Sequence, residues 1–364
     1  MRILYDNEIF LIQKYGGVSR YYYELIRRMP GFEAEVLLYM GKFINEYGLE
    51  NFKDKFRVYS GSKIKYIPNT KLISIRLQKP FFERFADKQK FDILHQTYFG
   101  NINVKPKHKR IVTVYDFTHE KFSKNFTVLD RSAKLKKIAI DKADGIICIS
   151  ESTRKDMEEM YNMKGKKVKV IYLANSLRYE IKSKPIIDGK YILYIGDRRS
   201  YKNFEIMIRL FEINSQLKNE YKLVCCGGGA FTKVEAEMIS KAGLEKNFVQ
   251  IGANDEKMAN IYKFAAVFVY PSKYEGFGIP LLESMYYECP IVASNVGSLP
   301  EIGGNAGLYF SPDSAEELSA SIDKVINDKN VSGDMKRKGL EREKFFSWDK
   351  CASETYNFYK EVLG

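Results

Sequence analysis

Residues 271–285, PSKYEGFGIPLLESM, follow an apolar run and carry two glutamates, Glu275 and Glu283, with seven residues between them. The two glycines between the glutamates expose backbone N–H groups to a phosphate or a sugar. Pro280 suits the first turn of a helix. That turn would also contain Glu283, which could accept hydrogen bonds from vicinal hydroxyls such as a ribose diol. Plainer roles stay open, because Glu283 can complement the helix dipole and Glu275 can make a local cap.

Short β-branched segments alternate with longer amphipathic segments on both sides of this stretch, a pattern typical of parallel sheets covered by helices. A polar segment at 177–190 interrupts the alternation, which then restarts. The sequence therefore predicts an α/β fold with two doubly wound domains facing a cleft, in which ligands bind at the carboxyl ends of the strands. Strands are expected at 2–5, 34–39, 91–95, 111–114, 145–149 and 168–171, then at 191–195, 221–226, 248–251, 266–270 and 291–294.

A glycine-containing loop follows the first expected strand. Residues 15–20, YGGVSR, lead into a helix, so Gly16 and Gly17 let backbone N–H groups approach an anion at the positive helix N-terminus. The same pattern also occurs at ordinary loop-to-helix junctions.

A basic loop follows the first expected strand of the second half. Residues 196–203, GDRRSYKN, contain Arg198, Arg199 and Lys202. Cations beside a strand end can neutralise a diphosphate and stabilise a departing nucleotide, with arginine as a bidentate fork and lysine as a point charge. Taken alone, the loop is equally compatible with a solvated turn.

Together, these stretches resemble one enzyme family. Residues 270–310, YPSKYEGFGIPLLESMYYECPIVASNVGSLPEIGGNAGLYF, are similar to the donor-binding signature of the retaining, GT-B-fold glycosyltransferases of family 4, with its E-x7-E motif. The opening at 5–25, YDNEIFLIQKYGGVSRYYYEL, resembles the glycine loop and first helix of the same family's N-terminal domain. Gly196, Arg198 and Lys202-Asn203 resemble its phosphate-binding element. The resemblance covers nearly the whole chain and implies the GT-B architecture of two Rossmann-like domains.

The resemblance implies roles for individual residues. Glu283 would bind the nucleotide ribose, and Glu275 would contact the donor sugar as a catalytic residue. The catalytic cations Arg198 and Lys202 would balance charge on the leaving diphosphate. The donor would also meet backbone groups of Gly16, Gly17, Phe277, Gly278 and Ile279. The family implies no metal and no cofactor beyond the nucleoside-diphosphate-sugar substrate.

Two positions depart from the family pattern. Many members have His-Asp after the fourth strand, contacting the donor sugar, where this sequence has Tyr115-Asp116 with His119 three residues on. The usual glycine after the strand at 168–171 is replaced within LANS, residues 173–176. Tyr115, Asp116 and His119 are therefore assigned to the sugar and acceptor side.

The expected domain boundaries follow from the interruption and from the family. Residues 1–180 would form the N-terminal, acceptor-side domain, and residues 181–345 the nucleotide-sugar-binding domain. The segment at 346–364 has an amphipathic helical pattern and, as the family implies, would cross back to complete the first domain.

Positive charge is concentrated in the first half. The chain carries 59 Lys+Arg and 46 Asp+Glu, a net charge of +13, whereas residues 1–180 alone contain 35 against 21, or +14. Clusters at 105–110 (Lys105, Lys107, Lys109, Arg110) and 134–137 (Lys134, Lys136, Lys137) favour an anionic partner such as a lipid surface. The alternative is a compositional excess on a solvated face.

The ends and cysteines of the sequence bear on its compartment. No secretory signal or apolar run of ~20 residues is present, and the five cysteines show no C-x-x-C spacing. We expect a cytoplasmic protein, peripheral at the inner face of the cell membrane, without a metal site.

These observations favour transfer of a hexose-type sugar from a nucleoside-diphosphate-sugar to a hydroxyl of a saccharide or lipid-linked acceptor, with retention, in surface polysaccharide synthesis. A sugar-phosphate or disaccharide synthase of the same fold is the nearest alternative, and a sugar-nucleotide epimerase fits E-x7-E poorly. A basic nucleic-acid-binding protein is a remote alternative, because no nucleic-acid recognition motif is present and we expect no nucleic-acid partner. The donor base, the sugar and the acceptor stay open.

Overall fold

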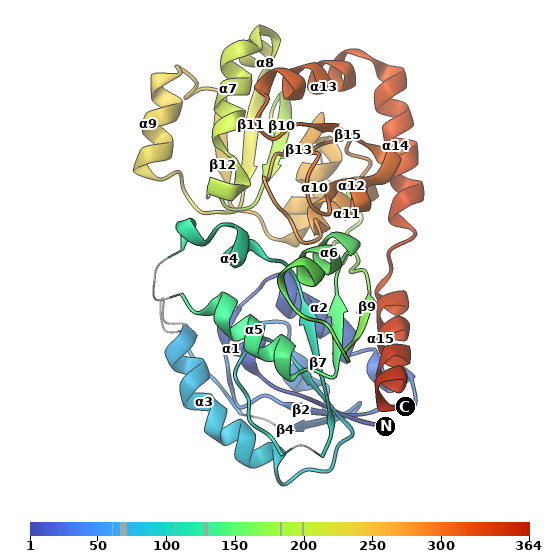
Figure 1. Ribbon diagram of the computed structural model, residues 1–364. Helices are drawn as coiled ribbons and strands as arrows, with labels where there is room; N and C mark the ends of the chain where they lie inside the picture. The colour runs from blue at the N-terminus through green and yellow to red at the C-terminus, as the bar shows by residue number, and fades with distance from the viewer. Residues whose placement is uncertain (60, 66–70, 106, 127–129, 183, 199) are drawn as a thin grey trace. The chain divides into compact units, whose positions relative to one another are not determined.

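The β-branched segments form two separate parallel sheets, each within its own unit of the chain (Figure 1). The computed structural model describes residues 1–364 except 60, 66–70, 106, 127–129, 183 and 199. One unit comprises Met1–Leu173 with Ser347–Gly364, and the other comprises Ala174–Phe346. Arg199 of the predicted basic loop lies outside the described residues.

Unit 1 contains a seven-stranded parallel sheet in the order β4-β2-β1-β6-β7-β8-β9. Its inner strand β1 is fully buried at Ile3, Leu4 and Tyr5, as expected for a parallel sheet covered on both faces. The strands are β1 (Arg2–Tyr5), β2 (Glu35–Tyr39), β4 (Arg57–Tyr59), β6 (Ile93–Gln96), β7 (Lys109–Val114), β8 (Gly145–Cys148) and β9 (Lys167–Val170), with a separate short pair, β3 (Lys42–Phe43) and β5 (Ser62–Lys63). The helices are α1 (Glu8–Ile12), α2 (Gly17–Ile26), α3 (Lys71–Ala86), α4 (Thr118–Lys121), α5 (Ser132–Lys142), α6 (Glu151–Met160) and α15 (Trp348–Leu363).

Unit 2 contains a six-stranded parallel sheet in the order β12-β11-β10-β13-β14-β15. Its strands are β10 (Lys190–Ile195), β11 (Tyr221–Cys226), β12 (Phe248–Ile251), β13 (Val267–Tyr270), β14 (Ile291–Ser294) and β15 (Gly307–Phe310). The helices are α7 (Glu205–Ile213), α8 (Ser215–Glu220), α9 (Lys233–Lys241), α10 (Asp255–Phe264), α11 (Ile279–Tyr286), α12 (Leu299–Gly303), α13 (Ala315–Asn327) and α14 (Lys329–Glu343).

Both sheets have the doubly wound strand order. The chain adds strands on one side of the first strand and then returns to add the remaining strands on its other side. This reversal, or switch point, lies between β1 and β6 in unit 1 and between β10 and β13 in unit 2. Loops that leave the carboxyl ends of these two strands diverge there, and the space between them is where such sheets bind ligands. The two switch points are therefore the places to examine for function.

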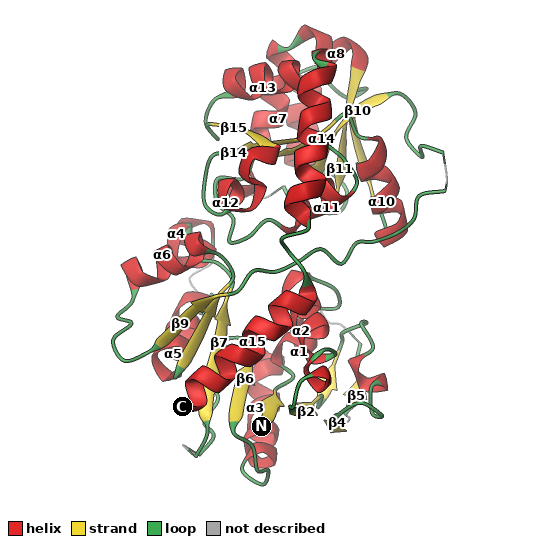
Figure 2. Cartoon of the chain, turned by 90° about the vertical axis from the view of Figure 1, so that its right-hand side faces the viewer, coloured by secondary structure: helices red, strands yellow, loops and turns green. Residues whose placement is uncertain are grey.

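Helix α15 belongs to unit 1, although it comes last in the sequence (Figure 2). The Tyr359 hydroxyl lies 2.6 Å from His95 Nδ1 and 2.9 Å from the Tyr5 hydroxyl, all within the buried core. Near the start of the helix, Arg28 Nε donates to Asp349 at 2.7 Å. Burial lowers the pKa of His95 to about 3, so the ring is neutral.

The boundary between the units lies at Leu173/Ala174 rather than at residue 180. The segment 174–180 makes hydrogen bonds to the rest of unit 2. Arg178 Nη2 donates to Glu343 at 2.6 Å, and the Tyr179 N–H donates to the Tyr287 hydroxyl at 2.8 Å. These contacts explain the difference from the sequence-based boundary.

Both predicted basic clusters include a buried cation. Lys136 is 2% exposed, and its ammonium donates to Glu120 and to the Asp116 carbonyl oxygen. Arg110 is also buried and donates to the Ile102 carbonyl oxygen at 3.1 Å. Of these clusters, only the remaining lysines are exposed.

Candidate functional site

The switch point of unit 2 brings Lys202 and Glu275 together. Lys202 lies in the loop after β10, and Glu275 lies in the loop after β13. Lys202 Nζ is 2.6 Å from Glu275 Oε1, and the two side chains are 15% and 13% exposed. Burial lowers the pKa of the Lys202 ammonium, but the adjacent Glu275 carboxylate together with Tyr270 and Tyr201 outweighs burial, and the pKa is well above its ordinary value. The site therefore holds a permanent cation at neutral pH.

Asn203 fixes the loop that carries Lys202. Its backbone has φ of 58°, in the left-handed region that non-glycine residues rarely adopt. The Asn203 amide donates to the carbonyl oxygens of Pro271 at 3.1 Å and Pro312 at 2.6 Å. The residue thus ties the loop after β10 to the loops after β13 and β15.

Ser298 and Gly297 hold the loop that carries Glu275. The buried Ser298 hydroxyl lies 3.0 Å from the Glu275 carbonyl oxygen and 2.9 Å from that of Phe277, and donates to one at a time. Gly297 has φ of 55°, and a Cβ there would lie 2.7 Å from the Glu275 carbonyl oxygen. Only glycine allows this close approach without a shift of the backbone.

Two backbone donors face away from the α11 helix at its N-terminus. Within the described residues, the N–H groups of Gly278 and Ile279 have no hydrogen-bond partner. Gly278 has φ of 99° and caps the helix. Unpaired N–H groups and the positive end of the helix dipole form a site for an anion such as a diphosphate. The predicted backbone contacts of Phe277, Gly278 and Ile279 stay a prediction that this geometry favours.

Glu283 lies in the second turn of α11 rather than the first, because the helix begins at Ile279. The Tyr262 hydroxyl donates to Glu283 Oε2 at 2.8 Å. Burial, together with the Glu283 charge, raises the pKa of Tyr262 well above its ordinary value, so the hydroxyl stays a donor. The half-buried carboxylate is thereby fixed in orientation, as a ribose-binding role requires.

Arg198 lies in the same loop as Lys202 but is buried. Its guanidinium donates to the carbonyl oxygens of Gly227 at 2.9 Å, Gly229 at 3.0 Å and Ala230 at 2.9 Å. Nε also lies 3.1 Å from Glu235 Oε1. In this conformation Arg198 holds the glycine loop after β11, whose residues 227–229 all have positive φ. Its contact with a diphosphate stays a prediction.

Gly16 and Gly17 open helix α2 at the carboxyl end of β1. A Cβ at Gly16 would lie 2.5 Å from Gln13 Oε1, which accepts from the Ser19 N–H at 3.0 Å. Within the described residues, the N–H groups of Gly17 and Val18 have no hydrogen-bond partner. Unit 1 therefore also presents backbone donors at a helix N-terminus.

Family models match both units of the chain. The model described as "Glycosyltransferase Family 4" matches residues 15–174, and the model described as "Glycosyl transferases group 1" matches residues 178–342. The chain belongs to the group 1 glycosyltransferases of family 4. The E-x7-E resemblance and the GT-B fold class are confirmed.

Relatives of this glycosyltransferase, in sequence or in fold, can be aligned with nearly its whole length. O-antigen chain mannosyltransferase B of Escherichia coli is 27% identical, over 94% of this chain and 96% of its own. Sucrose-phosphate synthase from Thermosynechococcus elongatus has a TM-score of 0.78 at 19% identity, over 100% of this chain and 99% of its own. Anabaena HepE, solved with UDP and glucose, has a TM-score of 0.73 at 16% identity, over 99% of each chain. The two solved structures show the shared fold.

The glycosyltransferase does not gather Tyr115, Asp116 and His119 into one cluster. Tyr115 is buried, with ring-centroid distances of 6.1 Å to Tyr21 and 6.2 Å to Phe99. Asp116 accepts from the Thr118 N–H at 3.0 Å. The His119 ring stacks on Phe126 at 4.2 Å, with Nε2 3.5 Å from Asp130. Their contacts with sugar or acceptor stay predictions.

Sequence reasoning missed two buried carboxylates at the unit 1 switch point. Asp6 accepts from the Thr97 N–H at 2.9 Å, the Thr97 hydroxyl at 2.5 Å and the Glu8 N–H at 2.8 Å. Glu8 accepts from the Gly100 N–H at 2.7 Å. Burial raises the pKa of Asp6 to about 6 and that of Glu8 well above its ordinary value. Their position directly after an apolar strand was the available signal.

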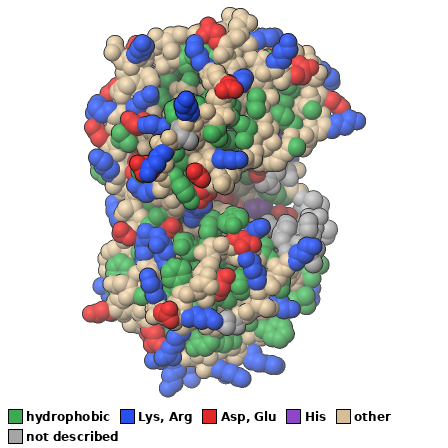
Figure 3. Space-filling model, turned by 180° about the vertical axis from the view of Figure 1, so that it is seen from behind, with side chains coloured by type: hydrophobic (Ala, Val, Ile, Leu, Met, Phe, Trp, Pro, Cys, Tyr) green, Lys and Arg blue, Asp and Glu red, His purple; other side chains and the backbone are tan. Residues whose placement is uncertain are grey.

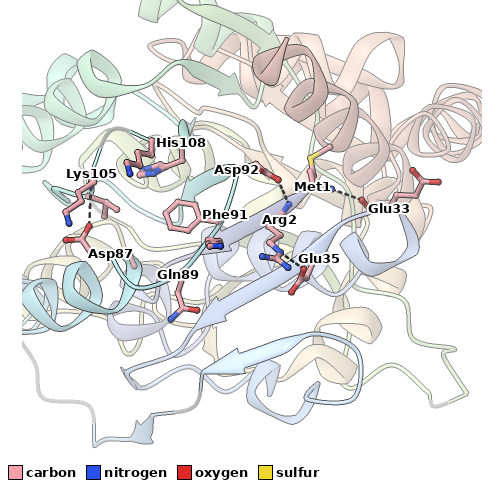
Figure 4. A pocket seen from close by; sticks show the side chains of 14 residues that line it. Met1, Arg2, Glu33, Glu35, Asp87, Gln89, Phe91, Asp92, Lys105 and His108 are labelled. Carbon is pink, nitrogen blue, oxygen red and sulfur yellow. Dashed lines mark hydrogen bonds and ion pairs between the residues drawn. The ribbon is translucent and has the colours of Figure 1, made fainter.

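A pocket of about 890 Å³ lies at the opposite end of the unit 1 sheet (Figure 4). It is lined by residues at the amino ends of β1, β2 and β6, where Arg2 Nε donates to Glu35 at 2.6 Å and the Arg2 N–H donates to Asp92 at 2.7 Å. Ligands of doubly wound sheets bind at the carboxyl ends instead. Among the described residues, no cluster of His, Cys, Asp or Glu could hold a metal ion, and no helix is long and apolar enough to cross a membrane.

Proposed function

We propose that this glycosyltransferase transfers a hexose-type sugar, with mannose the first candidate, from a nucleoside-diphosphate-sugar to a hydroxyl of a saccharide or lipid-linked acceptor. The reaction would retain the anomeric configuration and serve surface polysaccharide synthesis. The observation that carries the proposal is the Lys202–Glu275 pair beside the unpaired N–H groups of Gly278 and Ile279. The full-length relative named as an O-antigen chain mannosyltransferase and the UDP and glucose bound to HepE support this choice.

The chemistry follows from where charge develops. As the bond from the anomeric carbon to the diphosphate breaks, the electron pair goes to the leaving oxygen, and the sugar becomes oxocarbenium-like. A fixed cation and preorganised N–H donors beside that oxygen stabilise the charge. Lys202 supplies the cation, α11 supplies the donors, and Glu275 is placed at the sugar. The acceptor hydroxyl then bonds to the anomeric carbon on the face that the diphosphate leaves, and its proton goes to the departing diphosphate oxygen, so the configuration is retained.

A donor screen tests the proposal. Thermal unfolding is measured with UDP-, GDP-, ADP- and dTDP-sugars, and the product formed from the stabilising donor is examined by NMR. We expect one nucleotide class to raise Tm and the product to keep the donor's anomeric configuration. The absence of any stabilising nucleotide sugar, or an inverted product, contradicts the proposal. Transfer to a sugar phosphate rather than to a saccharide or lipid-linked acceptor identifies the synthase alternative.

We further propose that neither a metal nor a cofactor is required, because Lys202 and the helix N-terminus balance the diphosphate charge. Turnover should then persist in EDTA, whereas a strict dependence on Mg²⁺ or Mn²⁺ contradicts this part. The positive charge of unit 1 supports a location in the cytoplasm, peripheral at the inner face of the membrane, where a lipid-linked acceptor would lie.

A further inference from the structure

Helix α3 is apolar on two opposite faces. One face is buried, where Phe82 and Ala86 pack with Leu4 and Leu94 in the core of unit 1. The other face carries Ile73, Leu77 and Phe81, which are 61%, 63% and 62% exposed. Their spacing of four residues aligns them in one stripe along the helix.

The concentration of exposed apolar residues on α3 is unusual within this chain. The other large apolar side chains exposed in the described residues lie singly on separate elements: Tyr15, Met160, Tyr179, Ile186, Ile213, Val234, Phe264, Phe345 and Leu363. Single exposed apolar residues are ordinary, but a contiguous stripe indicates an interaction surface.

The charges beside the stripe are positive. Arg76 and Arg84 fall on the same exposed arc of α3, and Lys88 follows in the turn after the helix. None of the three makes an ion pair within the part of the chain that the structure describes. The acidic residues at the border of the arc already have partners in an ion pair or a hydrogen bond. Glu83 lies 3.6 Å from Lys79 Nζ, and Asp87 accepts from the Lys105 N–H at 3.4 Å.

The last contact brings further cations to the same edge. It holds the loop with the exposed Lys105 and Lys107 against the end of α3. Figure 3 shows Lys and Arg side chains gathered beside apolar ones along the lower edge of this unit. The expected cluster at 105–110 therefore contributes through these two lysines, without the buried Arg110.

We infer that this α3 surface, formed by Ile73, Arg76, Leu77, Phe81, Arg84 and Lys88, docks on an anionic lipid bilayer. The inference deepens the proposed function and rests on it for the identity of the acceptor. Apolar side chains of an amphipathic helix enter the boundary between headgroups and acyl chains, while flanking cations contact lipid phosphates.

The charge pattern favours a bilayer over a second copy of the chain. A symmetric dimer through this surface would bring its cations close to one another, without acidic partners on the arc. Helix α3 also packs against α1, the element between the first switch point and the Gly16-Gly17 loop. Docking through α3 therefore brings the predicted acceptor-side unit to the lipid surface.

Vesicle co-sedimentation of the full chain tests the inference with two matched pairs of variants. Ile73→Ser/Leu77→Ser is compared with Ile213→Ser/Val234→Ser, which removes two exposed aliphatic side chains from unit 2. Arg84→Glu/Lys88→Glu is compared with Lys241→Glu/Lys246→Glu, which makes the same change in net charge at two exposed lysines of unit 2. The vesicles contain phosphatidylglycerol and phosphatidylcholine, or phosphatidylcholine alone.

We expect the wild type to bind the anionic vesicles preferentially, and its binding to fall as salt rises. Each α3 double variant should lower the partition coefficient about tenfold or more, and its matched control by less than about twofold. Equal losses in variants and controls, or no wild-type binding at low salt, overturn the inference. A wild-type dimer in ultracentrifugation that Ile73→Ser/Leu77→Ser dissociates overturns it in favour of self-association.

Donor-induced thermal shift, measured on the same variants, separates this inference from the proposed function. The shift should be unchanged in all four variants, because α3 lies outside the donor site. If no nucleotide sugar stabilises the wild type but α3-dependent vesicle binding persists, the proposed function fails and the docking surface stands.

Discussion

The two switch points have the same topology but opposite character. In unit 2, Lys202 and Glu275 form an ion pair that remains partly exposed. In unit 1, the Thr97 hydroxyl donates a hydrogen bond to Asp6, and both residues are 0% exposed. A doubly wound sheet therefore provides a place for a ligand, but the side chains at its strand ends decide whether that place stays open.

The difference comes from how polar groups are satisfied. The short Asp6 side chain accepts from two backbone N–H groups and a hydroxyl, so its capacity is filled inside the protein. In unit 2 the backbone N–H groups of Gly278 and Ile279 stay unpaired within the described residues. Unit 2 is thus prepared for a ligand, whereas Asp6 stabilises a loop. The following predictions test this contrast.

The largest expected effect is that of Glu275→Gln. The amide keeps the shape but removes the charge that the proposed function places at the reacting sugar, so kcat should fall on the order of 10³-fold. Glu288→Gln is the matched control, because it removes the Glu288–Lys263 ion pair at 2.5 Å on the surface of the same unit. Steady-state kinetics measure both variants, and wild-type turnover in Glu275→Gln would falsify the assignment.

Lys202→Met should lower kcat about 10²–10³-fold, the range seen when one stabiliser of a developing anion is lost. Lys263→Met, which breaks the surface pair, should have almost no effect. Since Lys202 and Glu275 are in contact, their effects should not add, and the double variant should be little worse than Glu275→Gln. Additive losses in the double-mutant cycle would contradict a shared site.

Arg198→Met distinguishes the two cations of one loop. Because the guanidinium holds three or more carbonyl oxygens inside the protein, its loss should lower the free energy of unfolding by about 2–3 kcal/mol. Urea unfolding measures this loss. A variant with wild-type stability and a rate lowered as in Lys202→Met would instead show that Arg198 acts on the diphosphate.

Glu283→Ala should weaken donor binding about tenfold while kcat changes little, since a ribose contact is made in both ground and transition states. Tyr262→Phe removes the hydroxyl that orients Glu283 and should have a smaller effect in the same direction. Titration calorimetry with the stabilising nucleotide gives both affinities. A drop in kcat without a change in affinity would argue against ribose binding.

The smallest effect on rate is expected from Asp6→Asn, which should change stability instead. Because burial raises the pKa of Asp6 to about 6, the folded state binds this proton more tightly than the unfolded state. The resulting stability is present below about pH 4 and is lost as pH rises through about 6. Asp6→Asn should flatten this part of the stability profile, measured by urea unfolding between pH 4 and 7. An unchanged dependence of stability on pH, or a rate loss like that of Lys202→Met, would contradict the difference between the two switch points.

The sequence predicted the strands well, because burial on both faces leaves continuous β-branched segments. It missed β4 and β15, which are edge strands of three and four residues, and the two-residue strands β3 and β5. The motif also located Glu275 and Glu283 in the loop and helix after β13. Their pattern in the sequence was enough for that.

Contacts between distant segments could not be predicted. Lys202 and Glu275 are 73 positions apart, and only the strand order makes them neighbours. Lys136 looked like a surface cation, but it faces Glu120 on another helix and is buried. Likewise, nothing in the sequence of the loop shows that the Arg198 guanidinium turns inward to the glycine loop.

The position of α15 has a consequence for synthesis of the chain on the ribosome. Unit 2 is one continuous segment, Ala174–Phe346, whereas unit 1 needs Ser347–Gly364 to cover Tyr5 and His95. Although unit 1 emerges first, its core stays incomplete until the last helix has been translated, whereas unit 2 can fold as soon as its own segment has emerged. The order of folding is therefore the reverse of the order of emergence, and a chain released before residue 347 carries a finished unit 2 and an incomplete unit 1.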